Sequence, residues 1–368
     1  MAINRERLIK TTIELIDIYS PSGKEIQIVD HIAEYLKKNG ISYIKQPVSD
    51  ERCNLLINTD TASRDIVFMG HIDTVPAYNL DDYKSTIKDN MVIGLGACDM
   101  KGACAAMIEA FICYKEKYGK LPPISLALVV GEEESGDGAA CFCDEYFYEW
   151  AVIGEPTSMY PAFSHFGYLE MSITTTGTRK HASMVNFTKN AVHEMLAALN
   201  TITKFLDTEC RGCVYNLRDV SSSNAGFVVA ERCEAWIDIH IPPFYTAQHI
   251  TEKIKMMIEN NFPDSDEFAY DFPTMHTGYS LQKEGIVPEI FSSISDKPDN
   301  DSFPSDSDGA ILWKAGIKPV IIGPGSLAVA HTQEEFVCID ELVNAAETYF
   351  NFSDIYSKQL VDKKTCTD

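Results

Sequence analysis

The sequence predicts an α/β protein in which a smaller α+β domain of ferredoxin-like arrangement is inserted into a larger α/β domain. With 368 residues, the chain is long for a single hydrophobic core, which favours about two domains. Helix-like and strand-like patterns alternate up to Pro156, and alternating apolar–polar strands follow it. The alternation of helix-like and strand-like patterns returns near Ser280. We therefore expect a discontinuous larger domain at 1–166 and 279–368 around an inserted domain at 167–278.

The first segment alternates helices and buried strands. Apolar residues at helical spacing predict helices over 5–18, from Ile28 to a stop at Gly40, and over 101–118. Short uninterrupted apolar runs predict three strands, which are NLLIN, IVFMGHI and ISLALVV. Strands buried on both faces are typical of a parallel sheet covered by helices. In such sheets, ligands bind at the carboxyl ends of the strands.

The middle and the end of the chain follow other patterns. YLEMSITTTG and EAWIDIHI alternate as strands with one apolar face, EFAYDF is a further strand, and helices are predicted over 190–205 and 246–260. Two helices among about four strands resemble a small ferredoxin-like unit. Further on we expect a long polar loop at 295–308, a strand in KPVIIGPG and a last helix over 340–352.

Charge and composition exclude several classes of function. A formal net charge of −23 argues against binding to nucleic-acid phosphates or to anionic membranes. No apolar run approaches the roughly 20 residues of a membrane span, and the N-terminus lacks the layout of a signal peptide. The odd number of cysteines, 11, indicates reduced thiols and hence a cytoplasmic protein. Cys210 and Cys213 form a lone CxxC, which we interpret as ordinary packing thiols.

Potential metal ligands recur at predicted strand ends and before one helix. They are His71 and Asp73 in FMGHIDTVP, Asp99 in GLGACDMKG, the glutamates 132–134 in VVGEEESG, Glu155 in AVIGEPTS and His331 in IIGPGSLAVAHTQEE. Each has an ordinary alternative, since an aspartate before a helix is often a cap and a charge run is usually a solvated loop. Together they predict a cation site at one edge of the sheet. Histidine and carboxylate ligands without cysteine suit catalytic Zn²⁺ or a similar divalent metal.

In their order, these motifs resemble the co-catalytic zinc aminoacylase family over nearly the whole chain. That family includes acetylornithine deacetylase, succinyl-diaminopimelate desuccinylase and carboxypeptidase G. The resemblance implies two zinc ions per chain, with Co²⁺ as a possible substitute. It also implies that the inserted domain serves as a lid and as a dimerisation domain.

The resemblance assigns a role to most of the candidate residues. Glu133 would be the general base, and Asp73 would orient the His71 ring through its second nitrogen. Glu132 receives no chemical role. Glu155 would complete the metal held by His71, and Glu134 would complete the other. The implied ligands are His71, Asp99 as the bridge, Glu134, Glu155 and His331.

The inserted domain supplies a further expected catalytic residue, His181 in GTRKHAS. By resemblance, it would stabilise the oxyanion of the tetrahedral intermediate, and in dimeric members it comes from the partner subunit. Asn224 would contact the substrate. The backbone of the loop at Gly323 and Gly325 would line the substrate pocket.

One stretch departs from the family pattern. The lid strand usually reads Asp-x-Arg, where the arginine helps to bind the substrate carboxylate, but this chain has His240 there. Histidine cannot form the bidentate guanidinium–carboxylate pair. Either Arg179 or another basic residue substitutes, or the substrate is recognised differently.

The expected function is a cytoplasmic, homodimeric two-zinc amidohydrolase that removes a small acyl group from an amino acid. N-acetylornithine, a substrate of arginine biosynthesis, is the most specific expectation. A succinyl-diaminopimelate desuccinylase and a small dipeptidase are the nearest enzyme alternatives. A catalytically silent metal-binding homologue is the alternative of another class. The complete ligand set with an additional base argues against it, because a silent protein has no chemical need for that base.

Overall fold

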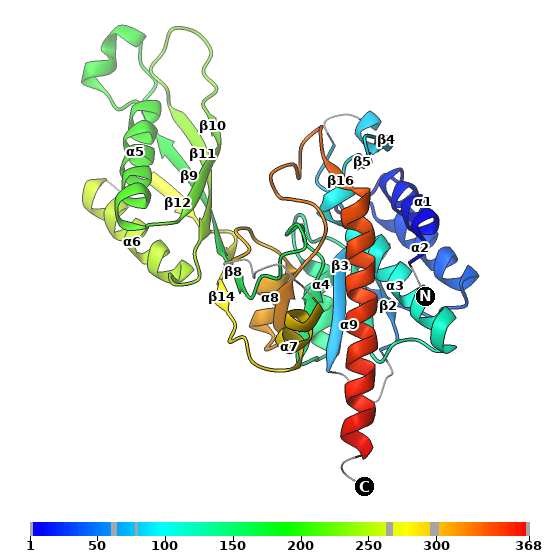
Figure 1. The fold of residues 1–368 in the computed structure, drawn as a ribbon. Helices are drawn as coiled ribbons and strands as arrows, with labels where there is room; N and C mark the ends of the chain where they lie inside the picture. Colours follow the sequence, from blue (N-terminus) through cyan, green and yellow to red (C-terminus); the bar gives the residue numbers. More distant parts are fainter. Residues whose placement is uncertain (1–2, 60–64, 78–79, 263–267, 295–301, 366–368) are drawn as a thin grey trace. The chain divides into compact units, whose positions relative to one another are not determined.

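A computed structural model describes residues 3–59, 65–77, 80–262, 268–294 and 302–365 (Figure 1). The chain divides into two compact units. The larger unit comprises Met1–Phe163, Leu281–Phe303 and Ser307–Asp368, and the smaller comprises Ser164–Ser280 with Pro304–Asp306. The structure divides the chain after Phe163 and after Ser280, where the sequence predicted divisions after residues 166 and 278, and Pro304–Asp306 groups with the smaller unit.

The larger unit is built on a six-stranded sheet. The strand order is β1-β2-β6-β3-β7-β15, and β6, β3, β7 and β15 are parallel to one another. The strands β1 and β2 pair antiparallel at one edge. The bounds are β1 Ile44–Pro47, β2 Cys53–Ile57, β3 Ile66–His71, β6 Ser125–Val129, β7 Trp150–Ile153 and β15 Lys318–Ile321.

Helices cover both faces of this sheet, which explains the uninterrupted apolar strands. On one face, the Phe68 ring of β3 packs against Phe111 of α3 and against Tyr349 and Phe352 of α9. On the other face, Val67 and Met69 share a core with Phe142 of α4 and Leu312 of α8. The helices of the unit are α1 Arg5–Ile16, α2 Ile26–Lys38, α3 Gly102–Tyr118, α4 Asp137–Glu145, α7 Ile286–Ile294, α8 Asp308–Lys314 and α9 Ile339–Thr365.

Short elements complete the larger unit. The strands β4 Thr86–Lys88, β5 Met91–Ile93 and β16 Phe336–Cys338 form a three-stranded sheet. A 3-10 turn, η1, spans Leu80–Tyr83, and a π-helical turn, η2, spans Ala97–Lys101 directly before α3. None of the helices over the described residues is long and apolar enough to cross a membrane.

The smaller unit has the chain order β9-α5-β10-β11-α6-β12, which is βαββαβ. Its sheet order is β10-β11-β9-β12, all antiparallel. Alternate residues of β9 and β11 face a core that they share with both helices. The bounds are β8 Ser164–His165, β9 Gly167–Thr176, η3 Ala182–Phe187, α5 Ala191–Glu209, β10 Val214–Ser221, β11 Arg232–Ile241, α6 Ala247–Asn261, β12 Phe268–Asp271, β13 Met275–His276 and β14 Tyr279–Ser280.

Two expected elements differ from the structure. Helix α9 continues to Thr365 instead of ending at residue 352, because no glycine or proline interrupts 353–365 and Tyr356 is buried. The expected polar loop at 295–308 lies outside the described residues up to 301, and its last residue, Asp308, begins α8. The described cysteines, Cys210 and Cys213 included, are free thiols.

Candidate active site

The candidate site lies at the carboxyl ends of three neighbouring parallel strands. Strand β3 ends at His71, β6 leads into the glutamates 132–134, and β7 leads into Glu155. Parallel strands deliver their carboxyl ends to the same edge of a sheet, so these side chains come together although they are far apart in sequence. Asp99 comes from the turn η2 before α3, and His331 comes from the loop after β15.

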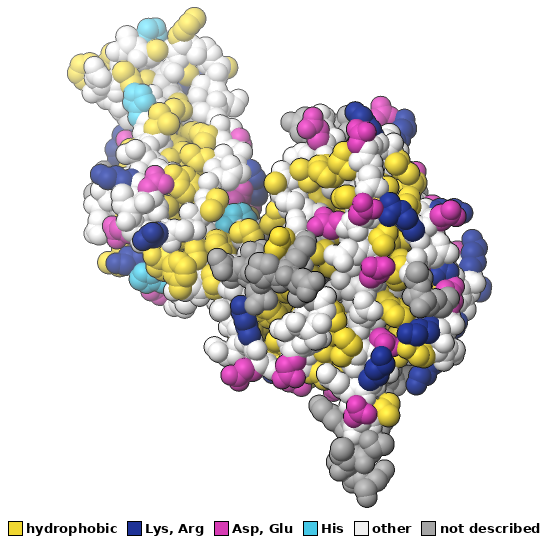
Figure 2. Space-filling view, in the orientation of Figure 1, with side chains coloured by type: hydrophobic (Ala, Val, Ile, Leu, Met, Phe, Trp, Pro, Cys, Tyr) yellow, Lys and Arg dark blue, Asp and Glu magenta, His cyan; other side chains and the backbone are white. Residues whose placement is uncertain are grey.

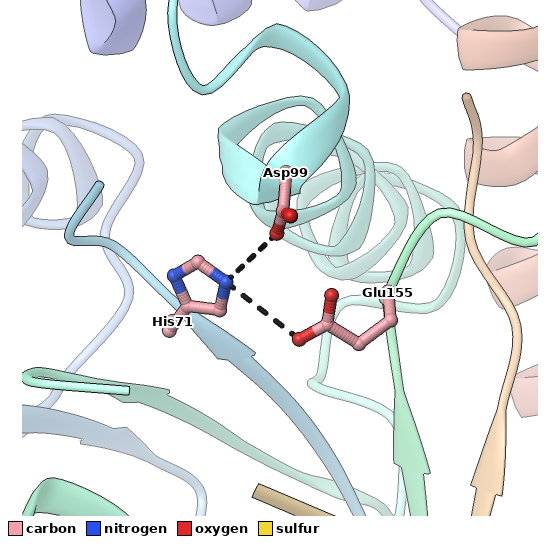
Figure 3. Close-up of side chains that lie close together, drawn as sticks. All are labelled: His71, Asp99 and Glu155. Atoms are coloured by element: carbon pink, nitrogen blue, oxygen red, sulfur yellow. Dashed lines mark hydrogen bonds and ion pairs between the residues drawn. The ribbon is translucent and has the colours of Figure 1, made fainter. Parts of the chain in front are cut away.

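The first ligand group contains His71, Asp99 and Glu155, all buried (Figure 3). His71 Nε2 lies 3.1 Å from Asp99 Oδ1 and 3.6 Å from Glu155 Oε1. Figure 3 shows both dashed contacts starting at the same ring nitrogen of His71, which faces the two carboxylates. Glu155 Oε1 is buried without a hydrogen-bond partner among the described residues. This geometry leaves one nitrogen and two carboxylate oxygens converging on a shared point.

The second group contains Asp99, Glu133 and His331. His331 Nε2 lies 3.3 Å from Asp99 Oδ2 and 3.1 Å from Glu133 Oε2. The two oxygens of Asp99 therefore belong to different groups, since Oδ1 faces His71 and Oδ2 faces His331. This is the arrangement of a carboxylate that can bridge two cations.

The three consecutive glutamates do not lie where the resemblance implied. Glu132 forms a third group with His71 and Glu133, and its Oε2 lies 3.8 Å from His71 Nε2. Glu134 is exposed and belongs to none of the three groups. The structure thus brings Glu132 and Glu133 to the site in place of Glu133 and Glu134.

Asp73 explains which glutamates point inward. Its carboxylate accepts hydrogen bonds from the backbone N–H of Glu132 at 3.3 Å and of Glu133 at 3.2 Å, and from Ser22 Oγ at 2.6 Å. Gly131 begins the turn with a φ of 77°, a value that favours glycine. The N–H groups of Ser135 and Gly136 then donate to Gly131 O, which closes the turn and leaves Glu134 outside.

Asp73 also borders the ring of His71, but chiefly through its backbone. His71 Nδ1 lies 3.1 Å from Asp73 O and 3.6 Å from Asp73 Oδ1. A carbonyl oxygen can only accept, so Nδ1 carries the hydrogen and donates it. The lone pair of a neutral ring then lies on Nε2, which faces the carboxylates and is suited to bind a metal.

A model of the family described as "Peptidase family M20/M25/M40" matches residues 67–354, which include all the site residues of the larger unit just described. The chain belongs to this family. Membership, together with the relatives that follow, identifies a metal-dependent hydrolase that acts on amide bonds.

Curated relatives of the M20 chain carry several different names at low identity. A probable succinyl-diaminopimelate desuccinylase of Staphylococcus aureus is 23% identical, and the alignment covers 94% of each chain. An acetylornithine deacetylase of Proteus mirabilis is 25% identical, and the alignment covers 90% of each. A probable carboxypeptidase of Aspergillus niger is 26% identical over 91% of this chain and 86% of its own.

Solved structures of M20 peptidases share the fold. A tripeptidase from Staphylococcus aureus superposes with a TM-score of 0.82 at 19% identity, over 97% of this chain and 100% of its own. A peptidase from Bacillus subtilis, described as dinuclear metal binding, gives a TM-score of 0.67 at 15% identity over 96% and 98% of the two chains.

Electrostatics of the M20 site favour positive charge between the carboxylates. Burial lowers the pKa of His71, but the surrounding carboxylates, Glu132 foremost, raise it well above its usual value. Burial also opposes the charged form of His331, yet hydrogen bonds to Asp99 and Glu133 raise its pKa to about 11. The carboxylates thus favour the protonated form of both imidazoles, and the same field would favour a divalent cation in place of those protons.

Burial and neighbouring charges also shift the pKa values of the carboxyl groups in the site. Burial is the largest cause that raises the pKa of Glu132 and of Glu155 well above the usual range; neighbouring carboxylates add to it, and the charge of His71 opposes it. Asp99 is the exception, because hydrogen bonds from the two histidines outweigh burial and lower its pKa. Buried carboxyls that resist ionisation in this way are found where a cation or a proton is handled.

The loop glycines expected to line the substrate pocket already use their N–H groups within the larger unit. Gly323 N donates to Thr157 Oγ1 at 3.2 Å, and Gly325 N donates to Glu341 Oε2 at 2.9 Å. A Cβ on Gly323 would lie 2.0 Å from Gly154 O, so only glycine fits between this loop and the strand end before Glu155. The expected contact of Gly323 and Gly325 with the substrate stays a prediction.

The smaller unit carries the three remaining predicted residues on neighbouring loops. His181 is exposed at the start of η3, and its Nδ1 accepts a hydrogen bond from Ser183 N at 3.3 Å. Arg179 donates to Ala225 O, next to Asn224. The predicted roles of Arg179, His181 and Asn224 stay predictions.

Two residues of the site received no role from the sequence. Glu132 was assigned no chemistry, although it adjoins the expected base. Glu335, four residues after His331, is 1% exposed, and burial raises its pKa to about 7. Its spacing from a predicted ligand was the available signal, but a second glutamate beside it, Glu334, made the choice ambiguous.

Proposed function

We propose that this M20 hydrolase is a two-metal amidohydrolase that removes a small acyl group from an N-acyl amino acid. The observation that carries the proposal is Asp99, whose two oxygens face two separate histidine-centred groups. A carboxylate shared in this way, with further acids on both sides, suits two adjacent divalent cations.

The residues present fit such a metal pair. Buried oxygens of Glu133 and Glu155 lack hydrogen-bond partners among the described residues, as metal ligands without their ion would. In the proposal, His71, Asp99 and Glu155 hold one ion, and Asp99, Glu133 and His331 hold the other. Nitrogen and oxygen ligands without cysteine favour Zn²⁺, with Co²⁺ as a substitute. When bound, the two ions supply Lewis acidity and lower the pKa of a water molecule.

Glu132 is the proposed general base. Its carboxyl adjoins both ligand groups, and its raised pKa suits a group that must take a proton and release it again. It takes the proton from the attacking water and delivers it to the leaving nitrogen. The alternative assignment, with Glu133 as the base and Glu134 as a ligand, requires the exposed Glu134 to turn inward against the Gly131–Gly136 turn.

His181 is the proposed donor to the oxyanion of the tetrahedral intermediate. Its Nδ1 accepts the Ser183 N–H, so the ring hydrogen of a neutral imidazole lies on Nε2, where it can be donated. Asn224 and Arg179, on adjoining loops, are proposed substrate contacts. Because His240 replaces the usual lid arginine, Arg179 is the candidate for binding the substrate carboxylate, although Glu231 lies 3.4 Å from it.

The best specific substrate is N-acetylornithine, which would place the enzyme in arginine biosynthesis. The support is a relative named acetylornithine deacetylase and the stretch GPGSLAVAHTQEEF, which resembles acetylornithine deacetylases more than it resembles peptidases. Desuccinylation of succinyl-diaminopimelate is the nearest alternative, supported by a relative of that name, and cleavage of a small dipeptide is a further one. The free thiols of the described cysteines support a cytoplasmic setting.

A homodimer through the smaller unit is also proposed. Strand β10 is an edge strand, and its side chains Val214, Leu217 and Val220 are exposed. Phe187 and Phe227, at the loop end of the unit, are 78% and 88% exposed. Figure 2 shows hydrophobic side chains on the surface of this unit. An unpaired edge with exposed apolar groups is a surface suited to a second copy of the chain.

The deciding experiment measures hydrolysis of N-acetyl amino acids, N-succinyl amino acids and free dipeptides by protein of known Zn²⁺ content. We expect two Zn²⁺ per chain and the highest kcat/KM on N-acetylornithine. Faster cleavage of a succinyl substrate or a dipeptide would redirect the substrate assignment. Absence of all hydrolysis with two ions bound would instead support the silent metal-binding homologue.

A further inference from the structure

The loop after β15 contacts the turn that carries Asp99 at two places. The first contact is at Gly325 and Ser326, and the second is at Glu335. At the first contact, Cys98 Sγ lies 3.7 Å from Ser326 O. A Cβ on Gly325 would lie 2.2 Å from Cys98 Cβ, so the two backbones are in close contact there.

At the second contact, one carboxylate oxygen holds two successive backbone N–H groups. Glu335 Oε1 accepts from Cys98 N at 3.0 Å and from Asp99 N at 3.1 Å. The backbone of Glu335 also joins the segment before the turn, because Gly94 N donates to Glu335 O at 2.9 Å. The side chain is 1% exposed, so water does not compete for these bonds.

Glu335 is not itself one of the candidate ligands. It belongs to none of the three ligand groups found among the described residues. Its Oε1 is occupied by the two amides, and its effect on the site must therefore pass through the backbone of Asp99. Because His331 lies only four residues earlier on the same loop, Glu335 connects the backbones of two proposed ligands of one ion.

We propose that Glu335 is a positioning residue that fixes the Asp99 carboxylate relative to His331 by holding the Cys98 and Asp99 amides. The inference rests on the proposed metal-binding function. A bridging carboxylate has to reach two ions at once, so a displacement of about 0.5 Å in its backbone weakens binding at both. Loss of such a supporting contact typically costs about 10–100-fold in metal affinity.

Three substitutions of Glu335 separate the effect of the side chain's length from the effect of its charge. Glu335→Gln keeps an acceptor oxygen at the same reach and removes the charge. Glu335→Asp keeps the charge and withdraws the acceptor by one methylene. Glu335→Ala removes both. Glu334, the exposed neighbour, supplies matched controls as Glu334→Gln and Glu334→Asp.

The experiment measures the Zn²⁺ dissociation constant of each folded protein by competition with a chromophoric chelator, and the thermal midpoint of the metal-free protein. We expect Glu335→Gln to stay within about 3-fold of the parent, and Glu335→Asp and Glu335→Ala to bind about 10–100-fold more weakly. The Glu334 variants should match the parent. If Glu335→Ala does not fold, the Gln–Asp pair still decides the outcome.

Two results would overturn the proposal. Weaker Zn²⁺ binding in Glu335→Gln together with parent-like binding in Glu335→Asp would show that charge, and not the held amides, is what matters. Lower thermal midpoints with unchanged Zn²⁺ affinity in all three variants would show a role in core stability alone. Failure of the proposed metal binding is recognised separately, because the parent protein would then bind no Zn²⁺. Failure of the proposed hydrolysis alone leaves the Zn²⁺ affinities of the variants comparable as before.

Discussion

Nε2 of His331 lies 3.1 Å from Oε2 of Glu133. This contact joins the loop after β15 to the turn after β6 and pairs a histidine with the middle one of three identical residues. It carries the revised assignment, in which Glu133 is a ligand and Glu132 the base, because the exposed Glu134 makes no such contact.

Replacement of each glutamate in turn by glutamine tests this assignment. Glu133→Gln should lower Zn²⁺ affinity by about 10–100-fold, because it removes an anionic ligand. Glu132→Gln should keep the metal and lower kcat by about 10²–10⁴, as expected for a lost general base. Glu134→Gln, the exposed neighbour, serves as the control and should resemble the parent. Metal content and kcat are measured on the same preparations. Metal loss in Glu134→Gln with normal metal in Glu133→Gln would restore the assignment first implied by the sequence.

Metal removal should abolish activity. Because the site offers two ligand groups that share Asp99, about two divalent ions should bind per chain. Exhaustive chelation followed by elemental analysis gives the metal-free protein, and titration with Zn²⁺ or Co²⁺ should restore hydrolysis up to that stoichiometry. Full activity in protein shown to be free of metal would refute the mechanism.

The metal-free protein should lose stability as the pH rises from about 6.5 toward 11. The pKa of His331 is raised in the folded state to about 11, so its contribution is fully present below the unfolded value and is lost as the pH approaches the folded one. His71 has a pKa shift of the same direction. Thermal midpoints at about pH 6.5 and 9 measure the slope, which should be shallower in His331→Ala. A slope unchanged by that substitution would mean that His331 is not its source.

Zn²⁺ affinity should rise with pH over the same range, because both imidazoles must release protons before they bind the ion. Calorimetric titrations in buffers of different ionisation enthalpy report the number of protons released. Binding without proton release would show that the histidines are neutral in the metal-free site.

Mixed subunits test the proposed dimer. If His181 acts on the partner's site, inactive Glu132→Gln protein mixed with inactive His181→Ala protein should recover part of the parent activity. Subunit exchange is verified independently with differently tagged chains. Mixtures that exchange subunits and stay inactive would show that His181 does not act across the dimer.

Much of the fold follows from local patterns in the chain. Buried parallel strands read as apolar runs, so the strands that end at His71 and before Glu155 were predictable, as was the alternation that gives β9 and β11 one apolar face. The far end of α9 was not predictable in the same way. Its continuation past residue 352 depends on the burial of Tyr356, which a periodic pattern does not report.

The sequence by itself determined which residue types follow the strands, because the end of an apolar run and the residues after it are local properties of the chain. His71, Asp99, Glu155 and His331 were expected at one edge of the sheet, and the structure brings them together. Only the tertiary structure decided which two of three identical glutamates face inward. The deciding bonds run from the Glu132 and Glu133 amides to Asp73, 59 and 60 residues earlier in the chain. A hydrogen bond between segments so distant depends on how they pack, and no spacing within GEEESG encodes it.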